Sequence, residues 1–123
     1  MSKRTCMVAL EAPFMKMVLG TILSDLGYDV VGLPGSGQDV IQTYKEHHPD
    51  LVFLDLIMPD MEGADIVHEI CKDDPNAYVI VCTSLGKQKQ ILDALKCGAK
   101  DFVLKPFTPP IIKEITEKAM PVH

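Results

Sequence analysis

Residues 49–63 read Pro49-Asp50-Leu51-Val52-Phe53-Leu54-Asp55-Leu56-Ile57-Met58-Pro59-Asp60-Met61-Glu62-Gly63. The apolar run at 51–54 lies between a Pro-Asp pair and a loop containing proline and glycine, which predicts a buried strand of a parallel sheet. Asp55 follows at the carboxyl end of that strand, the edge where open α/β sheets bind ligands. This placement makes Asp55 the first candidate for a functional side chain.

The rest of the chain alternates between strand-like and helix-like segments. Strands are expected at 6–10, 28–32, 51–55, 78–82 and 102–104, and helices at 13–26, 38–47, 64–72, 87–97 and 111–120. Gly27 and Gly98 are expected to end the first and fourth helices. The apolar spacing gives the helix at 87–97 an inner face of Ile91, Leu92 and Leu95. Short connections between alternating elements predict a parallel sheet with right-handed crossovers.

Length and composition restrict the class of protein. The 123 residues fit one domain covering 1–123, and we expect no attached output domain. No apolar run is long enough to cross a membrane and the start lacks a secretory signal, which indicates a cytoplasmic protein. The net charge of −5 disfavours nucleic-acid binding. The four scattered cysteines, at positions 6, 71, 82 and 97, are expected to be free thiols.

Three segments together resemble the receiver domains of two-component systems. They are the stretch around Asp55, the run Val79-Ile80-Val81-Cys82-Thr83-Ser84, and the run Asp101-Phe102-Val103-Leu104-Lys105-Pro106-Phe107. The resemblance extends from about residue 3 to about residue 118. It implies a flavodoxin-like three-layer α/β/α fold with a five-stranded parallel sheet in the order 2-1-3-4-5.

The resemblance also implies roles for individual residues. Asp55 would be the phosphoacceptor, with Lys105 and Thr83 contacting the phosphoryl group. Thr83 and Phe102 would form a conformational switch, and the peptide bond between Lys105 and Pro106 would be cis. A carboxylate suits the acceptor role because it attacks phosphorus once charge on the phosphoryl oxygens is neutralised. Such a domain catalyses at most its own phosphoryl transfer and dephosphorylation, so we do not expect an enzyme.

The expected Mg²⁺ site departs from the family pattern. Receivers end their first strand with two adjacent acids, and the gap-free alignment places Leu10 and Glu11 there. An alignment shifted by one residue would instead place Glu11 and Ala12 there. In either alignment one of the two acids is missing. Glu11, Asp55 and the Met58 carbonyl would therefore hold Mg²⁺ more weakly than a receiver that has both acids.

Two functional interpretations follow. In the first, a stand-alone receiver of the chemotaxis type accepts a phosphoryl group from a histidine kinase and binds a downstream protein through residues 87–119. Ile91, Phe102 and Ile112 are candidates on that face, although the sequence fits a place in the core equally well. A monomer or weak homodimer is expected. In the second, Lys105 neutralises Asp55 directly, and the domain is a binding module that works without phosphorylation.

Other classes fit the sequence less well. A haloacid dehalogenase needs a second aspartate two residues after the first, where this chain has Ile57. A flavodoxin needs a hydroxyl-rich phosphate loop after its first strand, where this chain has Glu11-Ala12-Pro13-Phe14. The run Lys87-Gln88-Lys89 is interpreted as a solvated helix start.

Overall fold

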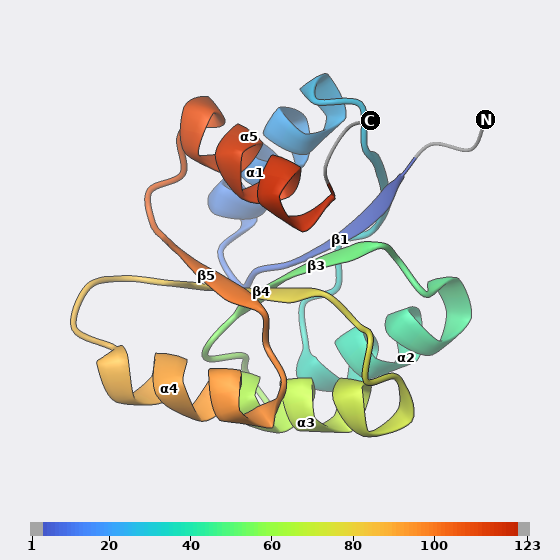
Figure 1. Cartoon of the computed structure of the whole chain (residues 1–123), viewed down its shortest axis with the longest axis vertical. Coiled ribbons are helices and arrows are strands. Elements are labelled where there is room, and N and C mark those ends of the chain that lie inside the picture. Colours follow the sequence, from blue (N-terminus) through green and yellow to red (C-terminus); the bar gives the residue numbers. More distant parts are fainter. Residues whose placement is uncertain (1–3, 121–123) are drawn as a thin grey trace.

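Five parallel strands form a single sheet in the computed structural model, which describes residues 4–120 (Figure 1). The sheet order is β2-β1-β3-β4-β5, as predicted. The strands are β1 (Thr5–Ala9), β2 (Asp29–Gly32), β3 (Leu51–Asp55), β4 (Val79–Thr83) and β5 (Asp101–Leu104). β3 therefore occupies the centre, and the acid at its end lies in the middle of the sheet edge.

Helices cover both faces of the sheet. Figure 1 shows α1 and α5 on one face and α2, α3 and α4 on the other. The helices are α1 (Pro13–Asp25), α2 (Gly37–His47), α3 (Gly63–Asp73), α4 (Gln88–Cys97) and α5 (Pro109–Ala119). None of the helices between residues 4 and 120 has the length and apolar character needed to span a bilayer. This arrangement is the three-layer α/β/α fold expected from the sequence.

A separate hydrophobic core lies on each face of the sheet, because successive residues of a strand point to opposite faces. Leu51 and Phe53 of β3 pack toward α1 and α5, whereas Val52 and Leu54 pack toward the other helical layer. Every residue of β3 is buried. Because each fully buried large apolar side chain contributes about 2 kcal/mol, this double burial fixes the position of the strand.

The element boundaries agree with the prediction to within about two residues. Gly27 and Gly98 follow the ends of α1 and α4 with φ angles of 94° and 124°, a conformation that glycine adopts without a side-chain clash.

One predicted side-chain orientation is wrong, that of Leu92, and one that the sequence left open, that of Ile112, is decided by the structure. Leu92 is 54% exposed, so it does not belong to the inner face of α4, where Ala94 is fully buried. Ile112 is fully buried in the core beneath α5 and is therefore unavailable to a partner. In both helices two apolar residues are adjacent, and a helix turns by about 100° per residue, so only one of each pair faces the sheet.

Candidate functional site

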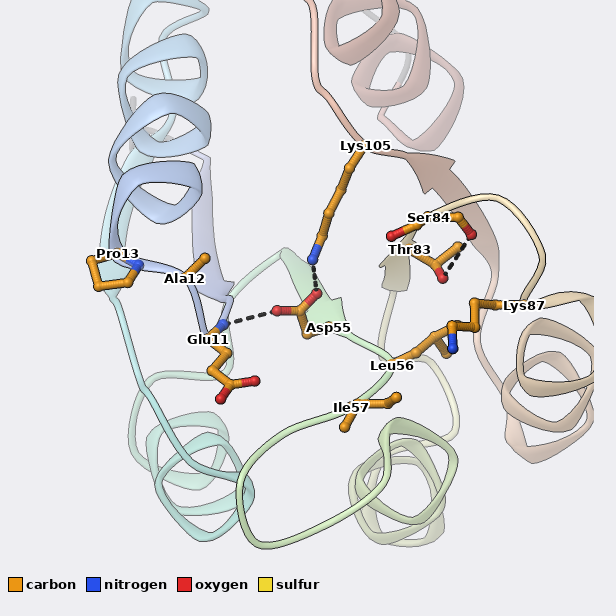
Figure 2. Close-up of a pocket in the computed structure, with 10 residues that line it drawn as sticks. All are labelled: Glu11, Ala12, Pro13, Asp55, Leu56, Ile57, Thr83, Ser84, Lys87 and Lys105. Carbon is orange, nitrogen blue, oxygen red and sulfur yellow. Dashed lines mark hydrogen bonds and ion pairs between the residues drawn. The ribbon is translucent and has the colours of Figure 1, made fainter.

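The carboxyl ends of the central strands surround a cleft of about 520 Å³ (Figure 2). β1 and β3 leave the sheet here toward opposite helical layers, which creates the opening that such folds use for ligands. The cleft is lined by Glu11, Ala12, Pro13, Asp55, Leu56, Ile57, Thr83, Ser84, Lys87 and Lys105. Of the residues predicted to act at the site, the fold brings together Glu11, Asp55, Thr83 and Lys105.

Asp55 lies at the floor of the cleft and is 5% exposed. Its Oδ1 pairs with Lys105 Nζ at 2.5 Å. Its Oδ2 accepts a hydrogen bond from the backbone N–H of Glu11 at 2.8 Å. The ion pair and the hydrogen bond satisfy a nearly buried carboxylate and fix its orientation. Figure 2 shows both contacts as dashed lines.

Lys105 reaches Asp55 from the residue directly after β5. Its backbone N–H donates to the Thr83 carbonyl at 2.7 Å, which continues the ladder between β4 and β5. The Lys105–Pro106 peptide bond is cis, as the resemblance implied. The long stem then carries the ammonium across the strand ends to the carboxylate.

The two predicted switch residues do not contact Asp55. The Thr83 hydroxyl, at the end of β4, donates to the Ser84 carbonyl at 3.2 Å (Figure 2). Phe102 in β5 is 41% exposed and is absent from the lining of the cleft. The hydroxyl is therefore close to the cleft but engaged elsewhere, and the aromatic ring is directed outward.

Leu10 and Glu11 occupy different environments at the end of β1. The register between β1 and β3 pairs Ala9 with Leu54, so the next residue, Leu10, lies level with Asp55. Leu10 is fully buried and packs in the core beneath α1. Glu11 is exposed at the rim of the cleft, with its carboxylate directed away from Lys105 (Figure 2).

The donor set available to a divalent cation is small. Glu11 and Asp55 supply carboxylates to the cleft, whereas Met58 is 3% exposed and is absent from its lining. Within residues 4–120 there is no cluster of three or more Asp, Glu, His or Cys side chains that suits a metal. Magnesium accepts one or two carboxylates when water and phosphate complete its shell, so these residues fit the ion only in that limited way.

The loop after Asp55 is attached to the start of α2, a contact that the sequence analysis missed. Asp60 Oδ1 accepts a hydrogen bond from Gly37 N at 2.6 Å, and Oδ2 accepts one from Gln38 N at 3.1 Å. The bond from Gly37 is the main cause of a lowered pKa for the Asp60 carboxyl. Ser36, the N-cap, signals the helix start in the sequence, but no local pattern indicates an acid from a distant loop.

Lys87 was also missed. It was predicted to face solvent, but it is half-buried and lines the cleft. It occupies the N-cap position of α4, where the chain leaves the loop that follows Thr83.

None of the four cysteines lines the cleft. All four are free thiols, as expected, with Cys6 and Cys82 buried in the sheet. Burial raises the pKa of the Cys6 thiol to about 12. Burial, assisted by the nearby Asp55 carboxylate, likewise raises the pKa of Cys82. These thiols therefore stay protonated and act as small apolar side chains.

Comparisons with known proteins agree on one family. Residues 7–117 match the response regulator receiver domain family. The chain is 44% identical to a chemotaxis protein CheY of Thermotoga maritima, over 96% of this chain and 98% of the relative. A chemotaxis protein CheY of Bacillus subtilis is 39% identical over 89% of this chain and 92% of its own length.

Solved structures give the same result. CheY in a CheX–CheY–BeF₃–Mg²⁺ complex from Borrelia burgdorferi superposes with a TM-score of 0.87 at 28% identity, over 94% of this chain and 87% of that one. The response regulator domain of Thermotoga maritima CheB gives a TM-score of 0.86 at 28% identity, over 99% of each chain. The protein therefore belongs to the response regulator receiver domain family.

Proposed function

We propose that Asp55 accepts a phosphoryl group from the phosphohistidine of a histidine kinase, and that the domain then signals by binding another protein. The observation that carries the proposal is the Asp55–Lys105 pair at the floor of the strand-end cleft, with Thr83 beside it. Receiver domains are signalling modules, and the accepting role is general in the family. We place this activity in the cytoplasm.

The transfer follows from the contacts of Asp55. An Asp55 oxygen attacks phosphorus, the P–N bond to the kinase imidazole breaks, and the imidazole leaves with the electron pair. Lys105 lies within ion-pair distance of Asp55 and neutralises charge on the arriving phosphoryl oxygens. The hydrogen bond from Glu11 N keeps the carboxylate aimed into the cleft throughout. Asp55 thereby becomes an acyl phosphate.

The switch would start at the Thr83 hydroxyl. This hydroxyl donates to the Ser84 carbonyl, a neutral acceptor that it exchanges readily for a charged phosphoryl oxygen. Rotation of Thr83 would leave space beside β4 for the half-exposed Phe102 ring to turn inward. Phe102 pairs with Val81 of β4, and Thr83 lies two residues further along the same strand, so both side chains are on the same face of the sheet.

Magnesium would be held by the carboxylates of Glu11 and Asp55, with the Met58 carbonyl as a third ligand, and would supply positive charge to the phosphoryl oxygens. Leu10 contributes no ligand, because its side chain is apolar and fully buried. We therefore expect weaker Mg²⁺ binding than in a receiver with two acids at the end of β1.

The proposed output surface is formed by α4, β5 and α5. Its exposed apolar side chains are Leu92, Phe102, Leu104 and Ile111. Ile91 is half-buried against the core and contributes less. A face of this kind suits a protein partner, because it offers apolar area close to the moving Phe102 ring. We expect a monomer or weak homodimer in the unmodified state.

A second candidate function has one observation in its favour. Lys105 neutralises the Asp55 carboxylate without a phosphoryl group. Because position 10 is a buried leucine, no second acid repels the charge of Asp55 there. Such a site permits a binding module that works in one fixed conformation.

Intact-mass spectrometry after incubation with acetyl phosphate separates the two functions. We expect one labile phosphoryl adduct on the wild-type protein and none on Asp55→Asn. Comparing reactions with Mg²⁺ and with EDTA then measures how far the cation is needed. No adduct under either condition would reject phosphorylation and favour the fixed binding module.

A further inference from the structure

Lys87 is a second cation in the cleft that holds Asp55. It is half-buried at the N-cap position of α4 and lines the same opening as Asp55, Thr83 and Lys105. Within residues 4–120 no ion pair or hydrogen bond engages its ammonium group, whereas Lys89, two residues later, pairs with Asp93 at 3.2 Å. The ammonium group of Lys87 is therefore available to an anionic group bound in the cleft.

The charges in the cleft are arranged on two sides of Asp55. In Figure 2 the Glu11 carboxylate lies on one side, while Thr83 and Lys87 lie on the other. The Lys87 side chain runs from the start of α4 toward Leu56. A phosphoryl group on Asp55 would therefore have an acidic side, suited to a cation, and a basic side, suited to its own oxygens.

The number of charges supports the same assignment. Two carboxylates, Glu11 and Asp55, and two ammonium groups, Lys87 and Lys105, line the cleft, so their formal charges cancel. Phosphorylation replaces the single charge of the Asp55 carboxylate with about two charges on the phosphoryl group, so the cleft gains about one negative charge at neutral pH. Because Leu10 supplies no metal ligand, little of that charge can be assigned to a tightly held divalent cation. Lys105 already pairs with Asp55, so Lys87 is the other cation of the cleft lining that can face the added charge.

We propose that Lys87 contacts the phosphoryl group on Asp55, as a third contact beside Thr83 and Lys105, and sustains phosphorylation when Mg²⁺ is weakly bound or absent. This inference rests on the proposed function. With acetyl phosphate as donor, an Asp55 oxygen attacks phosphorus and the P–O bond to the acetyl group breaks. Acetate leaves with the electron pair, so the step balances without an oxidant or reductant. An ammonium on a flexible stem has three donors with which to follow the phosphoryl oxygens.

The test compares Lys87→Met with Lys89→Met, since both lose one positive charge from α4 or its cap but only Lys87 lines the cleft. The phosphorylation rate with acetyl phosphate is measured by intact mass, in EDTA and in Mg²⁺. In EDTA we expect Lys87→Met to react about tenfold more slowly than wild type, as for a lost hydrogen bond to a charged group. We expect Lys89→Met to react at the wild-type rate and Lys87→Arg to recover most of the loss.

A binding measurement gives a readout that does not depend on the reaction. Beryllium trifluoride imitates a phosphoryl group, and its bound state is followed by fluorine NMR in EDTA. We expect Lys87→Met to shift the bound fluorine resonance and to weaken binding, with no such change for Lys89→Met. Circular dichroism melts verify that each variant is folded.

The outcomes separate this inference from the function on which it rests. If wild type is phosphorylated in EDTA and Lys87→Met matches Lys89→Met in rate and fluorine shift, Lys87 makes no phosphoryl contact while the receiver function stands. If wild type forms no adduct and binds no beryllium trifluoride in either condition, both proposals are wrong.

Discussion

The backbone N–H of Gly37 donates to Asp60 Oδ1 at 2.6 Å, which joins the loop after Asp55 to the first turn of α2. Close packing strengthens the junction, because a Cβ at Gly37 would lie 2.7 Å from Met61 Sδ. The same loop carries Met58, the proposed carbonyl ligand for Mg²⁺. The position of that carbonyl therefore depends on a contact with a different helix.

Asp60→Ala should lower the melting temperature at neutral pH, because two N–H groups at the start of α2 lose their acceptor. The hydrogen bond from Gly37 N–H holds the folded pKa of Asp60 below its ordinary value. Its stabilising contribution is therefore fully present above that value and is lost as pH falls through the folded pKa. Melts of both proteins across the acid range should thus converge at low pH. A difference that stays constant with pH would contradict the assignment.

Leu10→Asp should bind Mg²⁺ more tightly than wild type, since it adds a carboxylate beside those of Glu11 and Asp55, at a position level with Asp55 in the sheet. It should also cost about 3 kcal/mol of unfolding free energy without metal, because Leu10 is fully buried. Isothermal titration and urea unfolding, with and without Mg²⁺, measure the two effects. Leu10→Asn is the matched control, and it should lose stability without gaining affinity. If Leu10→Asp bound Mg²⁺ no more tightly than wild type, the proposal that Leu10 weakens Mg²⁺ binding would be wrong.

Lys105→Met should destabilise the protein by about 3 kcal/mol, because the 5% exposed Asp55 carboxylate loses its counter-ion. In an Asp55→Asn background the same substitution should cost less than about 1 kcal/mol, since no buried charge remains. Urea unfolding of the four proteins gives the coupling energy. Additive effects would mean that the ion pair does not hold the two side chains together in solution.

Gly63→Ala should unfold the β3–α3 junction, because an added Cβ would lie 2.8 Å from Leu56 Cα and 2.9 Å from the Asp55 carbonyl oxygen. Both are backbone atoms that cannot rotate away, so we expect a loss of more than about 3 kcal/mol. Gly20→Ala is the control, since nothing lies within 4 Å of its added Cβ inside α1. That variant should gain about 0.5–1 kcal/mol in helix propensity. Thermal melts distinguish the two.

The individual strands and the position of Asp55 could be predicted from local signals in the sequence, whereas the strand order and the roles of Thr83 and Lys105 were implied by the resemblance to receiver domains. Apolar runs closed by turn residues predict strands, and the carboxyl ends of parallel strands share an edge. The segments ending in Asp55, Thr83 and Lys105 each have such a run, so their meeting at one cleft follows from the strand order.

The remaining features depend on contacts that no local pattern contains. Ile111 and Ile112 are adjacent and equally apolar, and only packing against the sheet directs Ile112 inward. The direction of Lys87 depends on the irregular backbone at the start of α4, where its φ and ψ are −112° and 34°. Asp60 meets Gly37 across 23 residues of chain. Each is set by tertiary structure.

The hydrogen bond that orients Asp55 comes from the main chain of Glu11, not from its side chain. Every amino acid except proline carries that N–H, so evolution can replace the side chain at position 11 without losing the orientation of the acceptor. The Glu11 side chain thus affects the affinity for a divalent cation, whereas its main chain orients the Asp55 carboxylate. A substitution at position 11 can therefore change the affinity for a divalent cation while the Asp55 carboxylate keeps its direction.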